Sequence, residues 1–265
     1  MTARGARYAR MFERLAGERA GGFIPFAMLG DPNPEAGLST VRTLARSGAD
    51  ALELGLPFSD PIADGPVIQA AATRALSAGV TRGDCWTIVR EIRGEFPELP
   101  IGLLVYANLV CHHDPAEFYR EAAAAGVDSV LVADLPVAES GPIAGAAKAE
   151  GIAPVFIAPP NADAERLRAI AGAGEGYTYV TSREGVTGAD ARLRRDQSRL
   201  IEQLRSFGAP PPVLGFGIAN PDQVRAALAM GAAAVISGSA IVQRASKGEP
   251  LEPFVREMKA ATRFP

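Results

Sequence analysis

The sequence predicts an α/β fold, a single (β/α)8 TIM barrel with an extra N-terminal helix, over residues 1–265. The length of 265 residues is close to the roughly 250 that such a barrel takes. Short apolar runs alternate with segments of helical periodicity, which is typical of parallel βαβ units. No G-x-G-x-x-G follows the first apolar run, which disfavours an open dinucleotide-binding sheet. No shift in composition divides the chain, so we expect one domain.

The first elements are recognised by their spacing of apolar residues. Met11, Phe12 and Leu15 lie among arginines and glutamates and predict a short amphipathic leading helix. Beyond it, eight short apolar runs predict strands. They are Gly22–Leu29, Asp50–Gly55, Ile101–Tyr106, Ser129–Ala133, Ala153–Ala158, Tyr177–Val180, Val213–Phe216 and Ala234–Ser237.

The segments between these runs carry apolar residues at helical spacing, as Leu38, Val41 and Leu44 do. Several end in a glycine directly before the next strand, where a left-handed residue terminates a helix. The expected helices are Pro34–Ser47, Val67–Phe96 (two helices broken near Gly79–Gly83), Pro115–Ala125, Val137–Glu150, Asp163–Ala173, Asp196–Phe207, Pro221–Met230 and Ile241–Thr262, the last interrupted at Gly248–Pro250.

Composition excludes several classes of protein. The net charge of −3 gives no basic excess, so we expect no nucleic-acid partner. The two cysteines form no C-x-x-C pair and the two histidines, His112 and His113, are adjacent, so neither a metal site nor a disulfide framework is predicted. No segment reaches the ~20 apolar residues of a membrane helix. The arginine-rich start lacks the apolar run of a secretory signal, and we expect a cytoplasmic protein.

A carboxylate in the second strand is the first candidate for chemistry. Strand alternation places Leu52 and Leu54 on one face and Glu53 on the other, among small residues. Burial raises the pKa of a carboxylate and suits it to acid–base catalysis near neutral pH. Asp60 and Asp64 follow in the loop Leu56–Gly65, which we expect at the mouth of the barrel. Taken singly, Glu53 could be a strand-edge residue, and each aspartate a turn former.

Two glycine-rich turns predict a phosphate site. Gly217 follows the seventh strand, while Gly238 and Ser239 follow the eighth and open a helix. Barrels often bind phosphate at these two loops, where backbone N–H groups and a helix N-terminus favour an anion. The charged loop Thr181–Arg195 predicts a lid, and a plain surface loop is the alternative. Its Gly185, Thr187 and Gly188 could complete the phosphate cradle.

Eight motifs together resemble the tryptophan synthase alpha subunit family over almost the whole chain. They are PFAMLGDP (25–32), ALELGLPFSDPIADGP (51–66), IGLLVYANLV (101–110), GVDSVLVADLPVAES (126–140), APPNAD (158–163), GYTYVTSREGVTG (176–188), GFGIANP (215–221) and ISGSAIV (236–242). The resemblance implies a carbon–carbon lyase that cleaves indole-3-glycerol phosphate by a retro-aldol reaction to indole and glyceraldehyde 3-phosphate. It implies no cofactor and no metal in this chain.

The resemblance also assigns residues. Glu53 matches the glutamate that protonates indole C3 and later takes the glycerol hydroxyl proton, and Asp64 matches the aspartate that binds the indole N–H. Tyr179 matches a tyrosine near this pair, although Tyr179 and Tyr177 could equally be packing residues. Gly188, Gly217, Gly238 and Ser239 match the phosphate binders, and Thr187 matches a lid threonine. The implied indole pocket is Phe26, Leu104, Leu131, Ala133, Ile157 and Phe216, which core packing would explain equally well.

A partner is implied too: a PLP-dependent beta subunit in an alpha2beta2 heterotetramer, coupled through the loop with Asp60 and Pro61. Met28 and the stretch Cys111–His113 depart from the family pattern, and they motivate a second hypothesis, a free-standing lyase without a beta subunit. Another phosphate-binding barrel enzyme, an isomerase or epimerase, is disfavoured by the Glu53/Asp64 pair. A non-catalytic regulatory paralogue is disfavoured because these carboxylates and Thr187 are all retained.

Overall fold

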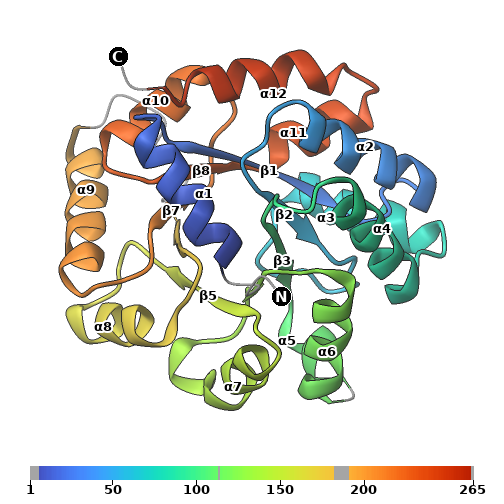
Figure 1. The fold of residues 1–265 in the computed structure, drawn as a ribbon, viewed down its shortest axis with the longest axis horizontal. Coiled ribbons are helices and arrows are strands. Elements are labelled where there is room, and N and C mark those ends of the chain that lie inside the picture. The colour runs from blue at the N-terminus through green and yellow to red at the C-terminus, as the bar shows by residue number, and fades with distance from the viewer. Residues whose placement is uncertain (1–5, 113, 182–190, 264–265) are drawn as a thin grey trace.

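The computed structural model describes residues 6–112, 114–181 and 191–263. Eight parallel strands form a closed barrel in sequence order, ringed by helices (Figure 1). The strands are β1 (Gly22–Met28), β2 (Leu52–Gly55), β3 (Ile101–Val105), β4 (Ser129–Val132), β5 (Ala153–Ala158), β6 (Thr178–Thr181), β7 (Pro212–Gly215) and β8 (Ala234–Ser237). The predicted (β/α)8 fold and all eight predicted strands are confirmed.

The helices cover the outer wall of the barrel, except for the first, which lies across its end. They are α1 (Ala6–Gly17), α2 (Pro34–Arg46), α3 (Pro66–Ser77), α4 (Arg82–Glu95), α5 (Ala107–Cys111), α6 (Pro115–Ala125), α7 (Gly141–Ala149), α8 (Ala164–Ala173), α9 (Ala191–Ser206), α10 (Pro221–Ala229), α11 (Ser239–Ser246) and α12 (Leu251–Ala260), with a 3-10 turn η1 (Val137–Glu139). The breaks expected near Gly79–Gly83 and Gly248–Pro250 are present.

Besides shifts of one or two residues at helix ends, the helices differ from the prediction at three places. The short helix α5 was not expected after β3. The helix predicted over Val137–Glu150 is divided at Ser140 into η1 and α7. The helix α9 begins at Ala191, so residues 191–195 are not part of a loop. This segment, ARLRR, lacks Gly and Pro and consists of good helix formers, which explains why it continues the helix.

Alternation along the strands divides the buried side chains into two layers. Leu52, Leu54 and their equivalents face outward and pack under the helices. The opposite faces fill the barrel interior, with large residues such as Ile24, Tyr177 and Ile236. Since Glu53 lies between Leu52 and Leu54, this alternation turns its side chain inward, as predicted.

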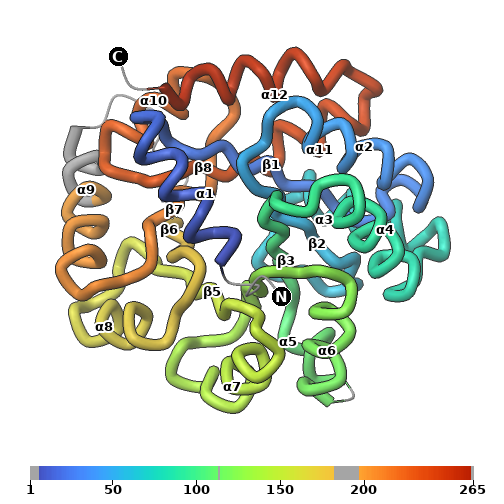
Figure 2. The backbone as a smooth tube through the Cα atoms, viewed as in Figure 1, coloured from blue at the N-terminus to red at the C-terminus, as the bar shows by residue number. Residues whose placement is uncertain are grey.

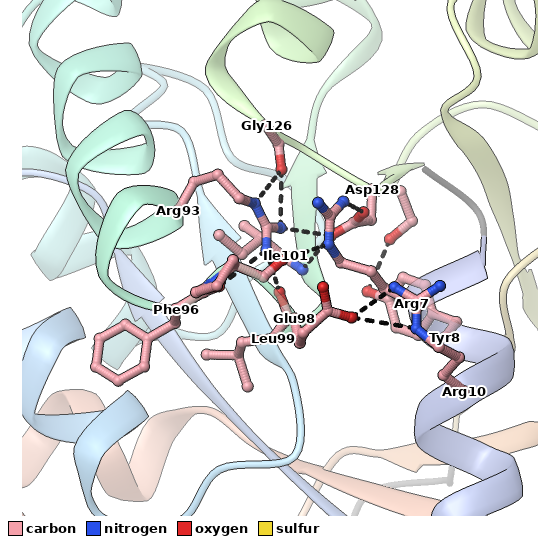
Figure 3. A network of polar contacts seen from close by, with 12 residues as sticks. Arg7, Tyr8, Arg10, Arg93, Phe96, Glu98, Leu99, Ile101, Gly126 and Asp128 are labelled. Atoms are coloured by element: carbon pink, nitrogen blue, oxygen red, sulfur yellow. Dashed lines mark hydrogen bonds and ion pairs between the residues drawn. The ribbon is translucent and has the colours of Figure 1, made fainter. Parts of the chain in front are cut away.

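The first helix lies across the amino-terminal ends of the strands, where two buried carboxylates hold it (Figure 1). Arg7 contacts Asp128, just before β4, at 2.7 Å, and Arg14 contacts Asp50, just before β2, at 2.7 Å. Arg93 of α4 contacts the same Asp128 at 2.6 Å. Figure 3 shows Arg93 and Arg7 approaching Asp128 from different sides. Because Asp128 is fully buried and has two charged partners, this network fixes α1 on the barrel.

The first and the last strand meet at the closure of the barrel. Strand β1 pairs with β8, and Figure 2 shows the blue amino-terminal strand beside the orange carboxy-terminal one. Within the described part of the chain, no helix has the length and apolarity to cross a membrane. Among the same residues, no cluster of His, Cys, Asp and Glu could hold a metal ion.

Candidate active site

A cavity of about 370 Å³ lies at the carboxyl ends of the strands. It contains Glu53 from β2, Asp64 from the following loop and Tyr179 from β6. Its apolar lining includes Phe26, Leu104, Ile68, Phe216, Ile218 and Ile236, and its glycine-rich side includes Gly217, Gly238 and Ser239. Barrel enzymes build their active sites at this end of the strands, and the volume lies in the range of small-molecule sites.

Glu53 is a buried acid at the wall of this cavity. Its side chain is only 2% exposed, and the Tyr177 hydroxyl donates a hydrogen bond of 2.9 Å to Glu53 Oε1. Burial raises the pKa of Glu53 to about 7, opposed by the Tyr177 hydrogen bond and reinforced by the negative charge of Asp64. Glu53 can therefore both give and take a proton near neutral pH.

Asp64 is held at the cavity by Tyr106. The Tyr106 hydroxyl hydrogen-bonds the Asp64 carboxylate and accepts the Ala63 backbone N–H at 3.1 Å. The Tyr106 ring stacks on Phe58, with 5.3 Å between ring centroids. Partial burial raises the pKa of Asp64, and the Tyr106 hydrogen bond opposes this rise. Asp64 thus lies in a more polar setting than Glu53, so the two carboxylates can hold different protonation states.

Tyr179 is a third ionisable side chain at the cavity, beside Glu53 and Asp64. Its ring occupies the space beside Gly215 on the neighbouring strand, where an added Cβ would collide with the Tyr179 hydroxyl and ring. Burial raises the pKa of Tyr179 well above its usual value, and the charges of Glu53 and Asp64 add to the rise. The phenol therefore stays protonated and can donate a hydrogen bond into the cavity.

The loops after β7 and β8 lie together at one side of the cavity. Phe216 has φ of 100° and Gly217 has φ of 72°, so the chain turns sharply at the end of β7 through two left-handed residues. Gly238 precedes α11, whose first residue is Ser239. Gly217, Gly238 and Ser239 line the same cavity as Glu53. Backbone N–H groups, a hydroxyl and a helix N-terminus together suit a phosphate group.

Comparison with known proteins gives the family. The family model of the tryptophan synthase alpha chain matches residues 12–263. A tryptophan synthase alpha chain of Shewanella baltica (strain OS155) is 54% identical over 264 residues, which cover 97% of this chain and 97% of that relative. One of Yersinia pestis (strain Pestoides F) is 54% identical over 265 residues, covering 97% of this chain and 99% of that relative.

The chain belongs to the tryptophan synthase alpha chain family.

Solved structures agree with this membership. Tryptophan synthase subunit alpha from Legionella pneumophila str. Paris superimposes with a TM-score of 0.86 at 29% identity, over 97% of this chain and 98% of that one. A chain in the tryptophan synthase α2β2 complex of Pyrococcus furiosus gives a TM-score of 0.81 at 34% identity, over 91% of this chain and 98% of that one. The family resemblance and the predicted lyase of tryptophan biosynthesis are therefore confirmed.

The tryptophan synthase alpha fold brings most of the predicted site residues together, but not all. Phe26, Leu104 and Phe216 line the cavity with the carboxylates. Leu131 is buried in the barrel interior and is not part of the cavity lining. Ala133 and Ile157 line a separate cavity of about 220 Å³ after β4 and β5. The lid residues Gly185, Thr187 and Gly188 lie outside the described residues.

Two tyrosines bound to the carboxylates had no role in the sequence prediction. Tyr177 holds Glu53, and Tyr106 holds Asp64. The only sequence signal for Tyr177 was its place two residues before Tyr179, on the same face of the strand. Met28, flagged as a departure, is buried in the barrel interior opposite Gly55, and its side chain fills space that Gly55 leaves open.

Proposed function

We propose that the cavity binds indole-3-glycerol phosphate and cleaves it to indole and glyceraldehyde 3-phosphate, with Glu53 and Asp64 as the catalytic pair. The observation that carries this assignment is a buried carboxyl with its pKa raised to about 7, facing a cavity that also contains a second, more polar carboxylate. Breaking the bond between an indole carbon and the glycerol chain needs a proton donor at that carbon and an acceptor for charge at the ring nitrogen.

The two carboxylates divide this work. Protonated Glu53 gives its proton to indole C3, and the positive charge that develops on the ring is stabilised by ionised Asp64 at the ring N–H. The Glu53 carboxylate then takes the proton of the glycerol hydroxyl, and the carbon–carbon bond breaks as that hydroxyl becomes an aldehyde. The proton count balances, because Glu53 ends the cycle protonated as it began. Tyr179, protonated and directed into the cavity, assists as a hydrogen-bond donor.

The remaining lining binds the substrate. Gly217, Gly238 and Ser239 hold the phosphate, with Gly188 and the lid residue Thr187 assigned by the family motif alone. Phe26, Leu104 and Phe216 contact the indole ring. Of the other residues assigned to the ring pocket from the motif, Leu131 contributes as buried packing in the barrel interior, whereas Ala133 and Ile157 line the neighbouring cavity. The reaction needs no cofactor in this chain, because acid–base chemistry supplies every step.

We further assign a beta subunit as partner, as in the α2β2 complex of Pyrococcus furiosus. Ile62, in the loop after β2, is 80% exposed, which is unusual for a large apolar side chain and suits a protein interface. Cys111 and His112 are also exposed, at the end of α5. PLP would belong to that partner. The membership found above does not favour the free-standing lyase. We also treat residues 1–265 as one domain, because β1 must pair with β8 to close the barrel.

Turnover of indole-3-glycerol phosphate, followed by indole release with and without a beta subunit, tests this proposal. We expect slow cleavage by the chain alone and a strong increase with the partner. Glu53→Gln should abolish turnover while leaving phosphate binding intact, because Gln cannot transfer the proton. Turnover of that variant at the parent rate would refute the assignment of the acid. Parent turnover that is fast and insensitive to a beta subunit would instead refute the partner.

A further inference from the structure

One residue of the amino-terminal helix reaches the underside of the active site. Tyr8 is 1% exposed, and its hydroxyl lies 3.0 Å from Ser129 Oγ at the start of β4. A Cβ added at Gly102 would lie 2.8 Å from the Tyr8 hydroxyl oxygen, so the absence of a side chain there makes room for it. Gly102 is the register partner of Glu53. Tyr8 therefore enters the barrel interior next to the strand position that carries Glu53.

Tyr8 also contacts the residue that holds Glu53. The rings of Tyr8 and Tyr177 lie with their centroids 5.4 Å apart and their planes tilted by 50°. Tyr177 in turn donates the 2.9 Å hydrogen bond to Glu53 Oε1. A continuous series of contacts thus runs from α1 through Tyr8 and Tyr177 to Glu53, on the side of the barrel opposite the cavity.

The position of Tyr8 is itself fixed on both sides. Arg7, the preceding residue, is bound to the buried Asp128 (Figure 3). The Tyr8 hydroxyl is hydrogen-bonded to Ser129, the residue after Asp128 and the first of β4. Arg14, two turns later on α1, is bound to Asp50. Two charged contacts and one hydrogen bond therefore set the angle at which the Tyr8 ring meets Tyr177. Such a contact can hold a catalytic side chain only if the supporting residue is itself immobile.

We propose that Tyr8 is a positioning residue for the lyase reaction: its ring, anchored by α1 and Ser129, holds Tyr177 in the orientation that aims Glu53 at the substrate. The inference rests on the proposed role of Glu53. This role of Tyr8 gives α1 a function in catalysis besides covering the end of the barrel. Tyr8 touches neither substrate nor reacting atoms and acts through Tyr177.

Replacement of the ring tests the proposal. Tyr8→Leu removes the contact with Tyr177, and we expect kcat for indole-3-glycerol phosphate to fall roughly tenfold, since small misplacements of a catalytic group are costly. KM should stay within about twofold, because the phosphate cradle is untouched. Tyr8→Phe keeps the ring and loses only the bond to Ser129, so it should lose about threefold in kcat. Arg10→Ala, which removes an exposed ion pair on the same helix, is the matched control and should leave kcat unchanged.

A double-mutant cycle separates positioning from general stability. If Tyr8 acts through Tyr177, Tyr8→Leu or Tyr8→Phe should cause no further loss of kcat once Tyr177→Phe has removed the hydrogen bond to Glu53. Losses that multiply in the double variant would overturn the proposal, as would a folded Tyr8→Leu protein with the parent kcat. If Tyr8→Leu does not fold, the Tyr8→Phe cycle decides by the same criterion. Turnover by Glu53→Gln would instead refute the proposed function, independently of Tyr8.

Discussion

Replacing Glu53 with Gln should make the protein more stable above neutral pH while it abolishes catalysis. The carboxyl has a pKa of about 7 in the folded protein, against a usual value of 4.5, because it is buried. Between these two pH values the folded state keeps a proton that the unfolded state has lost. Stability of the parent therefore falls as the pH rises through this window and is level above it.

The size of this effect follows from the same two values. At about 1.4 kcal/mol for each pH unit, the difference between 7 and 4.5 amounts to about 3 kcal/mol of lost stability. Gln carries no charge at any pH, its oxygen can still accept the Tyr177 hydrogen bond, and its amide group can face the cavity. The stability advantage of Glu53→Gln should therefore grow from near zero at acidic pH to about 3 kcal/mol above neutrality.

Urea titrations of the parent and the variant between pH 5 and pH 9 would measure the free energy of unfolding. Glu13→Gln, which makes the same substitution at an exposed glutamate of α1, is the matched control. A Glu53→Gln advantage of the same size at every pH would refute the reasoning, because the effect must come from ionisation. A parent more stable than the variant at pH 9 would refute it as well.

Three further substitutions test other contacts. Asp128→Asn should lower the free energy of unfolding by about 3 kcal/mol, since two arginines lose their buried counter-charge; an unchanged urea midpoint would contradict this. Ser239→Ala should raise KM for indole-3-glycerol phosphate about tenfold, by the loss of one hydrogen bond to phosphate, and leave kcat nearly unaltered; an unaltered KM would remove Ser239 from the cradle. Tyr106→Phe frees Asp64 and should lower kcat about tenfold in steady-state assays, and a parent-like kcat would show that Asp64 is positioned without it.

The sequence was sufficient for those features that depend on local periodicity. Alternation around Leu52, Glu53 and Leu54 correctly placed the carboxylate inside the barrel, since strand side chains have a period of two. The glycine-rich turns at Gly217 and Gly238 were correctly expected to lie side by side, because barrel topology brings the ends of β7 and β8 together. Both inferences needed only the order of elements along the chain.

Contacts between distant segments could not be predicted in this way. Periodicity gives the face of a strand that a residue occupies, but it does not say which residue on another strand is its neighbour. Tyr177 and Glu53 are 124 positions apart, and only the register of the closed barrel brings them within hydrogen-bond distance. The same reason explains why Ala133 and Ile157, expected in the indole pocket, line a neighbouring cavity at a different position around the mouth of the barrel.

Closure of the barrel has a consequence for how the protein is made. Strand β1 finds its second partner only in β8, and the ion pair between Lys259 and Asp50 joins residues 209 positions apart. A ribosome must therefore release residues 234–237 from its exit tunnel before the amino-terminal strand can complete its hydrogen bonds, and residue 259 before the ion pair can form. Until then the unpaired edge of β1 is exposed to other nascent chains, as an open sheet edge invites association. Synthesis of β8 thus sets the time at which the open edge of β1 is covered and can no longer pair with another chain.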